Sequence, residues 1–266
     1  MSTFAEAGGA LLSPFERIGA ALLLFVEEVG RVMTTLGRTL WWMTRPPYRF
    51  RLLLRQFDVV GVQSSFIIIL TAIFTGAVFS LQSSYALKMF EANSMVGPLV
   101  VLALTRELGP VLAALMVIGR VGSSMAAEIG TMRVTEQIDA LESMAVNPVQ
   151  YLIVPRVVAS VIMMPALATV FDFVGTVGSW VVTTKLLGVP SNEFIERVIY
   201  YVDFDDYYNG IIKAAVFGLI MAIIGCYQGF YATQGAEGVG RATTQSVVIA
   251  SVTVMVSNYF LTALLF

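Results

Sequence analysis

Long apolar runs without charge constrain the fold of this chain more than any other feature. Residues 59–87, VVGVQSSFIIILTAIFTGAVFSLQSSYAL, contain no charged side chain. A helix needs about 20 apolar residues to cross a bilayer, so this run can cross at a tilt. Four further runs lie near 95–119, 157–184, 211–232 and 242–266. Because lipid cannot satisfy free backbone amides, we predict an all-α membrane protein with five spans.

The amino-acid composition excludes several classes of function. Hydrophobic residues make up 57% of the chain and charged residues 13%, against about a quarter charged in soluble domains. The net charge of −2 and the scattered basic residues give no nucleic-acid-binding patch. Histidine is absent and Cys226 is the single cysteine, which we interpret as a small apolar helix residue. Ser-His or Cys-His catalysis, histidine-ligated zinc and an intrachain disulfide are therefore excluded.

The region before the first span has helical periodicity but many charges. Apolar side chains recur at helical spacing over 15–42, with Ser13-Pro14 as the predicted start. Trp41 and Trp42 then adjoin Arg45, Arg49, Arg51 and Arg55, as is typical of a membrane interface. We predict an amphipathic helix in the headgroup plane, within an interfacial region 1–56 that precedes a five-span domain 57–266. The alternative is a helix packed on a soluble partner.

Lysine and arginine set the predicted orientation. One side of the membrane carries Arg17, Arg31, Arg38, Arg45, Arg49, Arg51, Arg55, Arg120, Arg133, Arg156 and Arg241. The other side carries Lys88, Lys185, Arg197 and Lys213, with Glu193, Glu196, Asp203, Asp205 and Asp206. We therefore expect a cytoplasmic N-terminus. After five spans the C-terminus, at Phe266, lies on the far side.

Residues 131–148, TMRVTEQIDALESMAVNP, form an acidic segment between the second and third spans. Thr135 can cap a short helix whose apolar face is Ile138, Leu141, Met144 and Ala145, and Asn147-Pro148 ends it. An anionic cytoplasmic leaflet repels acidic side chains, so this helix suits a protein surface better than lipid headgroups. We predict that it docks a cytosolic partner. The alternative is an ordinary connecting helix.

Polar side chains interrupt the second and third spans. Arg106 and Glu107 open TRELGPVLAAL, where Pro110 can kink the helix. Ionised groups at this depth are costly, so they indicate either a functional polar site or a structural ion pair. Asp172 is either protonated or faces a partner helix.

Small and glycine-rich stretches suggest close helix packing and one turn. Pairs of small residues at four-residue spacing indicate tight helix contacts. They are Gly76 and Ser80, Ser123 and Ala127, Gly218 and Ala222, and Gly225 and Gly229. Packing within one bundle explains them, and they permit a homodimer without requiring one. The glycine-rich 233–244 lacks the lysine of a phosphate loop, and we predict a flexible cytoplasmic turn.

Residues 106–159, RELGPVLAALMVIGRVGSSMAAEIGTMRVTEQIDALESMAVNPVQYLIVPRVVA, closely resemble the core of the MlaE/YrbE permease family. FTGAVFSLQ at 74–82 and GVGRATTQSVV at 238–248 resemble the other recurrent blocks of the family. Such proteins are membrane subunits of ABC transporters that work with MCE proteins. The resemblance implies two paired permeases in a bacterial inner membrane, moving phospholipid between inner and outer membranes and so maintaining outer-membrane asymmetry. It implies no enzyme activity and no cofactor on this chain.

The resemblance also implies partners and roles. An ABC ATPase (MlaF-like) would bind ATP and Mg, since this chain has no Walker A sequence, and an MCE-domain protein (MlaD-like) would bind on the periplasmic side. A small STAS-domain protein (MlaB-like) is a further implied partner. The implied coupling residues are Glu128, Met132, Glu136, Gln137, Asp139 and Glu142. The implied lipid pathway is Phe79, Leu87, Phe90, Arg106 and Glu107.

Two alternative functions are also consistent with the sequence. An ion-coupled secondary transporter would use Glu107 or Asp172 as its proton site, although no inverted repeat is evident. An intramembrane aspartyl enzyme would need a second aspartate in a span, which Asp172 lacks. Copurification with a nucleotide-binding subunit separates the ABC permease from the secondary carrier.

Overall fold

The computed structural model describes residues 2–46, 49–233 and 235–265, with side chains from residue 19 onward except 21, 24 and 25. All regular structure in these ranges is helical. Five segments are long and apolar enough to cross a membrane: Phe50–Lys88, Asn93–Val134, Val149–Lys185, Phe204–Phe230 and Gly235–Leu265. The predicted all-α class and five spans are confirmed. The first three helical segments extend beyond both ends of their predicted apolar runs, whereas the last two begin earlier and end one or two residues sooner than predicted. Phe266, the predicted far-side end, lies outside the described residues.

The first three segments are composite helices. The first joins α2 (Phe50–Phe57), the π-helical turn η1 (Asp58–Val62) and α3 (Gln63–Lys88). The second joins η2 (Asn93–Met95), α4 (Val96–Ala103), η3 (Leu104–Leu108), α5 (Gly109–Val117), η4 (Ile118–Gly122) and α6 (Ser123–Val134). The third joins η5 (Val149–Ile153) and α8 (Val154–Lys185), whereas α10 (Phe204–Phe230) and α11 (Gly235–Leu265) are continuous.

Cationic side chains bond to carbonyl groups at three of the π-helical turns. A π turn shifts the backbone register and can leave a carbonyl without its usual amide partner. The donor–acceptor pairs are Arg120 Nη1 to Val59 O at 3.1 Å, Lys213 Nζ to Arg106 O at 2.9 Å, and Arg156 Nη1 to Leu152 O at 2.7 Å. The predicted orientation assigns these three cations to the two sides of the membrane without placing them in helices. They lie within helices, where the carbonyl bonds offset the cost of placing charge in a membrane protein.

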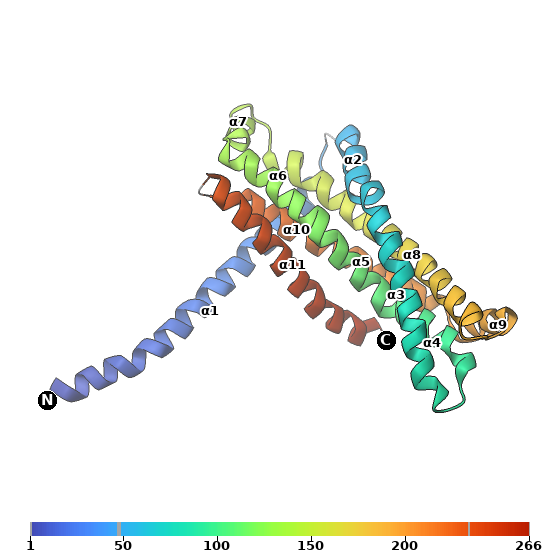
Figure 1. Ribbon diagram of the computed structural model, residues 1–266. Helices are drawn as coiled ribbons and strands as arrows, with labels where there is room; N and C mark the ends of the chain where they lie inside the picture. Colours follow the sequence, from blue (N-terminus) through green and yellow to red (C-terminus); the bar gives the residue numbers. More distant parts are fainter. Residues whose placement is uncertain (1, 47–48, 234, 266) are drawn as a thin grey trace.

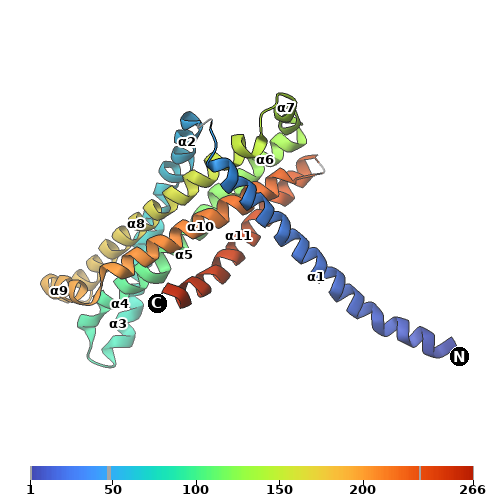
Figure 2. The same ribbon diagram turned by 180° about the vertical axis from the view of Figure 1, so that it is seen from behind.

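The helix α8 runs through the bundle with α3 on one side and α10 on another (Figures 1 and 2). Between α3 and α8 the backbones touch, because a Cβ on Gly76 would clash with the carbonyl group of Gly175. One turn further, the hydroxyl groups of Ser80 and Ser179 are hydrogen-bonded at 2.6 Å. This contact confirms the close packing predicted for Gly76 and Ser80.

Small residues of α10 make the second close contact in the bundle. A Cβ on Gly218 would lie 2.5 Å from the Ser160 carbonyl oxygen of α8. The carbonyl groups of Gly122, at the end of η4, and of Ala126 on α6 face Gly225 and Gly229, respectively. These tight positions are thus one residue before the predicted pair, Ser123 and Ala127, which are only half-buried.

The helix α1 (Ser2–Met43) projects away from the bundle, and its C-terminal part packs on η5, α8 and α10 (Figures 1 and 2). It begins well before the start predicted at Ser13-Pro14. Thr35 and Thr39 are buried against the bundle, whereas Leu22, Leu23 and Val26 are exposed. Tyr227 of α10 donates a hydrogen bond of 2.7 Å to Glu28, which fixes where α1 leaves the bundle.

The predicted turn at 233–244 is mostly wrong, because α11 begins at Gly235 and continues as helix. Glycines weaken an isolated helix, but packing can override propensity. Val239 of α11 packs close to Gly130 of α6, and this contact supports the helix. The remaining helix, α9 (Ser191–Tyr201), lies across the far ends of α4 and α8 (Figure 1).

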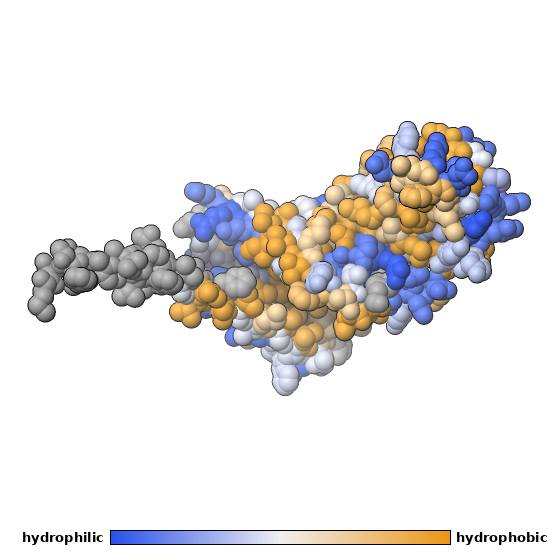
Figure 3. Space-filling model, turned by 90° about the horizontal axis from the view of Figure 1, so that it is seen from below, coloured by the Kyte–Doolittle hydropathy of each residue, from blue (hydrophilic) through white to orange (hydrophobic). Residues whose placement is uncertain are grey.

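Much of the outer surface is apolar, as a lipid environment requires. Figure 3 shows apolar residues over broad areas of one face, interrupted by hydrophilic groups. The helix α11 is the least covered crossing segment, since 11% of its most apolar window is buried, compared with 67% for α10. Its exposed side chains include Val248, Val252, Met255, Val256 and Tyr259.

Candidate functional site

The short helix α7 (Gln137–Ser143) stands at the end of α6, as predicted between the second and third crossing segments (Figure 1). Its start differs from the prediction. Thr135 does not cap the helix; its hydroxyl group donates back to the Thr131 carbonyl at 2.8 Å. Glu136 occupies the N-cap position in the left-handed conformation with φ of 58°, which turns the chain sharply from α6 into α7.

Only part of the predicted apolar face of α7 is buried. Ile138 is fully buried and Leu141 is half-buried, whereas Met144 is 65% exposed and Ala145 is exposed. The helix ends at Ser143, before the predicted end at Asn147-Pro148. The Asn147 side-chain oxygen instead accepts hydrogen bonds from the amides of Val149 and Gln150, at the start of η5. Helix α7 is therefore pinned to the bundle on one face and open on the other.

The six predicted coupling residues fall into two groups. Glu136, Gln137 and Glu142 are exposed, and no ion pair involving them is found among the described residues. Asp139 is exposed but paired with Arg133 at 2.7 Å. Met132 is half-buried. These residues cluster at the α6–α7 turn and give it an acidic, accessible surface, which we call the α7 surface (Glu136, Gln137, Asp139 and Glu142).

Glu128 is different from the α7 surface because it holds the bundle together. Its carboxylate lies 2.7 Å from Arg156 Nη2, and the Arg156 side chain is 6% exposed. Removing Glu128 would leave a nearly buried guanidinium without its counter-ion, although Leu152 O would still accept one hydrogen bond. The carboxylate therefore stabilises the α6–α8 contact.

A cluster of polar side chains lies inside the bundle, where the second, fourth and fifth crossing segments meet. Lys213 of α10 is fully buried and donates to Glu107 Oε1 at 2.8 Å and to Thr262 Oγ1 at 2.9 Å. Glu107 Oε2 accepts a hydrogen bond of 2.9 Å from Asn258. The Thr262 hydroxyl also donates to Glu107 Oε1 at 3.0 Å. We call these four residues the Glu107 cluster.

Pro110 explains why a lysine is needed here. A proline has no amide hydrogen, so the carbonyl group of Arg106, four residues earlier, receives no α-helical hydrogen bond from it. Lys213 Nζ supplies the missing donor at 2.9 Å. The same ammonium group thus neutralises Glu107 and satisfies the kinked backbone, which makes it costly to replace.

Arg106 and Glu107 are not paired with one another. Arg106 Nε lies 3.2 Å from Asp206 Oδ1, and the Arg106 side chain is 39% exposed. Asp206 also takes part in the capping box with Asp203 that begins α10. Arg106 therefore ties η3 to the start of α10, while Glu107 points to Lys213 and α11.

Sequence reasoning missed Lys213, Asn258 and Thr262. Lys213 was predicted at the edge of the fourth span, but α10 begins at Phe204 and places this residue well inside the helix. A signal was present, because a lone lysine in an apolar run needs a carboxylate partner. Asn258 and Thr262 are four residues apart on α11, and this spacing puts both on one helix face.

Asp172 of α8 is 6% exposed, and its Oδ1 atom has no hydrogen-bond partner among the described residues. It faces Gly109, where a Cβ would clash with that oxygen. The expectation that Asp172 faces a neighbouring helix is met, since Gly109 opens α5 directly after η3.

The three apolar residues predicted for a lipid pathway lie on α3 or directly after it, and their role stays a prediction. Phe79 and Leu87 are half-buried and pack against the hydrophobic core. Phe90, beyond the end of α3, is 78% exposed.

Comparison with known proteins gives one family. The model of the family described as "Permease MlaE" matches residues 53–264. A "Probable ABC transporter permease protein" of Rickettsia felis is 43% identical over 256 residues, covering 96% of this chain and 99% of that protein. A protein with the same description from Synechocystis is 43% identical over 213 residues, covering 80% and 81%.

A third relative carries a more specific name. The "Intermembrane phospholipid transport system permease protein MlaE" of Haemophilus influenzae is 39% identical over 250 residues, covering 94% of this chain and 96% of that protein. The match of the family model extends from α2 to the last turns of α11 and includes both the α7 surface and the Glu107 cluster. This chain therefore belongs to the MlaE permease family.

Proposed function

We propose that the chain is the permease subunit of an ABC transporter that moves phospholipid between the inner and outer membranes of a bacterium. The observation that carries the proposal is the acidic α7 surface, exposed at the end of the helical segment that also bears Glu107. One continuous segment, Asn93–Val134, thus joins a docking surface to a polar site in the membrane. The relatives named as ABC transporter permeases support the same function.

The partner that drives transport would be a separate ATPase, which binds ATP and Mg. Its contact would be the α7 surface, where Glu136 and Glu142 are exposed acidic groups. Because Ile138 is buried, α7 is not free to move independently of α6. Closure of paired ATPases would therefore tilt α6 and the rest of the segment as a rigid body. The chain itself would not be an enzyme.

A second copy of the chain would cover α11. The exposed apolar face of this helix is broad, and Glu107 behind it remains 37% exposed. An ionised carboxylate facing lipid is costly, whereas a cavity shared by two permeases can be hydrated. Pairing through α11 would thus enclose the two Glu107 clusters in one cavity, where phospholipid headgroups could bind.

The orientation in the membrane determines where the remaining partners would bind. Arginines 45, 49, 51 and 55 gather near the start of α2, which favours a cytoplasmic position for that end and for the N-terminus. The C-terminus would then be periplasmic in the inner membrane. An MCE-domain protein would bind on that side and exchange lipid with the permease. The name of the Haemophilus relative describes intermembrane phospholipid transport. A small STAS-domain protein would bind with the ATPase.

A pull-down from detergent-solubilised native membranes tests the function. The test variant is Glu136→Lys/Glu142→Lys, because neither carboxylate has an ion pair in the described structure. The matched control is Glu193→Lys/Glu196→Lys on α9, at the other end of the bundle. A second, differently tagged wild-type copy reports on pairing in the same experiment.

We expect wild type and control to retain an ATPase, an MCE protein and the second copy. The α7 variant should lose the ATPase and keep the second copy. Retention of the ATPase by the α7 variant would exclude the proposed coupling surface. Wild type purified without any ATPase would argue against the ABC permease and favour ion coupling through Glu107.

A further inference from the structure

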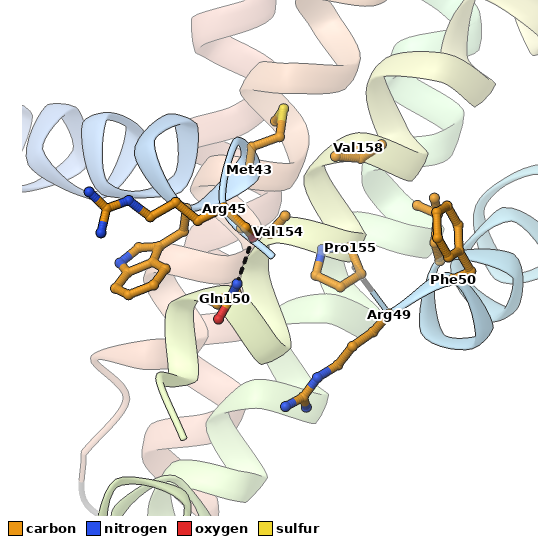
Figure 4. A pocket seen from close by; sticks show the side chains of 10 residues that line it. Met43, Arg45, Arg49, Phe50, Gln150, Val154, Pro155 and Val158 are labelled. Carbon is orange, nitrogen blue, oxygen red and sulfur yellow. Dashed lines mark hydrogen bonds between the residues drawn. The ribbon is translucent and has the colours of Figure 1, made fainter. Parts of the chain in front are cut away.

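A pocket opens where α1, α2 and α8 meet, and neither the α7 surface nor the Glu107 cluster includes it. Its volume is about 250 Å³. Leu53 of α2 and Val154, Pro155 and Val158 of α8 line its apolar interior, with Phe50 at one side (Figure 4). It lies at the α2 end of the bundle, whereas the Glu107 cluster is on η3, towards the α4 end (Figure 1).

Two guanidinium groups extend at the edge of this pocket (Figure 4). The Arg45 group lies 4.4 Å from the ring centre of Trp41, and the Arg49 group lies 4.3 Å from that of Tyr151. Such contacts use the faces of the guanidinium and leave its N–H bonds, which lie in the plane, available to other groups. Among the described residues neither side chain forms an ion pair or donates a hydrogen bond.

One hydrogen bond joins two of the elements that surround the pocket. Gln150 donates a hydrogen bond of 2.9 Å to the Arg45 carbonyl, which ties the end of α1 to η5 (Figure 4). The aromatic neighbours hold both guanidinium groups in place at little further entropic cost. Planar guanidinium donors match phosphate oxygens in pairs, so a guanidinium group at the edge of an apolar pocket suits an amphiphile with a phosphate.

We propose that this pocket binds one anionic phospholipid of the cytoplasmic leaflet, separate from the lipid that is transported. Its phosphate would lie at the pocket edge that carries Arg45 and Arg49, and one acyl chain would enter between Leu53 and Val158. Ligand pockets for whole small molecules span about 300–1,000 Å³, so 250 Å³ admits part of one chain rather than a whole lipid. The bound lipid would brace the junction of α1, α2 and α8.

Charge complementarity favours an anionic phospholipid as the occupant of this pocket. The cytoplasmic leaflet is negatively charged, and each arginine at its surface contributes on the order of 1 kcal/mol to attraction. A second protein copy or a soluble partner would have to supply both an apolar side chain and two acceptors at the same place. The inference needs only a membrane position for this end of the chain, so it stands or falls separately from the ATPase.

Tryptophan fluorescence reports on the pocket directly. The chain has three tryptophans. Two of them, Trp41 and Trp42, adjoin Arg45, and the third, Trp180, is bonded to Ser191 near α9. The experiment uses the purified full chain with Trp180→Phe in detergent, and adds phosphatidylglycerol or phosphatidylcholine with brominated acyl chains. Bromine quenches only nearby indoles, so quenching reports on a chain in or beside the pocket.

The test variant is Arg45→Gln/Arg49→Gln, and the matched control is Arg51→Gln/Arg55→Gln, which removes the same charge from α2 outside the pocket. We expect brominated phosphatidylglycerol to quench wild type at a lower mole fraction than phosphatidylcholine. In detergent no charged leaflet surrounds the chain, so only an arginine that bonds to the phosphate contributes. The test variant should therefore need roughly ten to thirty times more phosphatidylglycerol, and the control less than about twice as much. Equal losses in the two variants, or no headgroup preference in wild type, would overturn the proposal.

A third variant tests the acyl chain. Val158→Phe fills the half-buried wall of the pocket and leaves both arginines in place. We expect it to reduce quenching by both brominated lipids while helicity and elution volume stay unchanged. Undiminished quenching would mean that no chain enters the pocket. Quenching that falls as protein concentration rises would show that a second copy occupies this face instead, and would equally refute lipid binding.

Discussion

Lys213 Nζ lies 2.8 Å from Glu107 Oε1 inside the helix bundle, and the lysine side chain is fully buried while the glutamate remains 37% exposed. This asymmetry matters because an uncompensated buried charge costs more than a partly hydrated one. Lys213 also donates a hydrogen bond to the Arg106 carbonyl group, which has no amide donor because of Pro110. The pair therefore combines a role in folding with a polar site in the membrane.

Removing the carboxylate should be worse than removing the lysine. Glu107→Leu strands the ammonium of Lys213 in the bundle and should destabilise the protein by about 3–5 kcal/mol. Lys213→Met leaves Glu107 partly hydrated and bonded to Asn258 and Thr262, so we expect a smaller loss. Thermal unfolding in detergent measures both. The reverse order would show that Lys213 gains little from Glu107.

Close backbone packing at Gly76 gives a second prediction. Gly76→Ala would push its Cβ into the Gly175 carbonyl and should lower stability by about 1–3 kcal/mol. Gly119 is the matched control, because it is helical and a Cβ there meets nothing within 4 Å. Gly119→Ala should be neutral or stabilising by up to about 1 kcal/mol. Equal effects of the two substitutions would contradict the close contact of α3 and α8.

Glu128 and Glu142 should separate folding from coupling. Glu128→Ala removes the counter-ion of the nearly buried Arg156 and should lower the unfolding temperature of the permease without any partner. Glu142→Ala, at an exposed position, should change stability by less than about 0.5 kcal/mol but weaken ATPase binding. Stability assays and pull-downs on both variants check this. If the Glu128→Ala protein is stable but loses the ATPase, Glu128 contributes to ATPase binding rather than to stability.

The bond between Tyr227 and Glu28 should control how firmly α1 is held. Tyr227→Phe removes a hydrogen bond of 2.7 Å to a carboxylate, a type worth about 1.5–3 kcal/mol. We expect faster hydrogen exchange of α1 amides around Glu28, with α10 unaffected. Thr34→Val is a suitable control, because its exposed hydroxyl bonds only within α1, to the Arg31 carbonyl. Unchanged exchange in the tyrosine variant would mean that other contacts hold α1.

The fold could be predicted from hydropathy because each crossing segment must be a helix long enough to span lipid. The specific residue contacts between the helices could not be predicted from hydropathy. The π turns, and the cations that bond to their carbonyls, depend on which helices meet, as Arg120 and Val59 show. The helical start of α11 was hidden by its glycines, whose low propensity is overridden by packing against Gly130.

Part of the candidate site could be predicted from the sequence and part could not. The acidic α7 surface was evident from charge alone, since Glu136 and Glu142 stand between apolar runs. The partner of Glu107 was not, because Lys213 is 106 residues away along the chain and looked like the end of a span. Glu128 looked like its acidic neighbours, and only the position of Arg156 shows that it stabilises the bundle.

Site-specific crosslinking at α7 tests the central claim most directly. Cys226, the only cysteine, is buried, so a Cys226→Ala chain gives a clean background. Gln137→Cys on exposed α7 and Ser191→Cys on α9 each carry a photoreactive maleimide in native membranes. We predict that position 137 crosslinks to a nucleotide-binding ATPase subunit and position 191 does not. An ATPase crosslink at 191, or none at 137, would contradict the account.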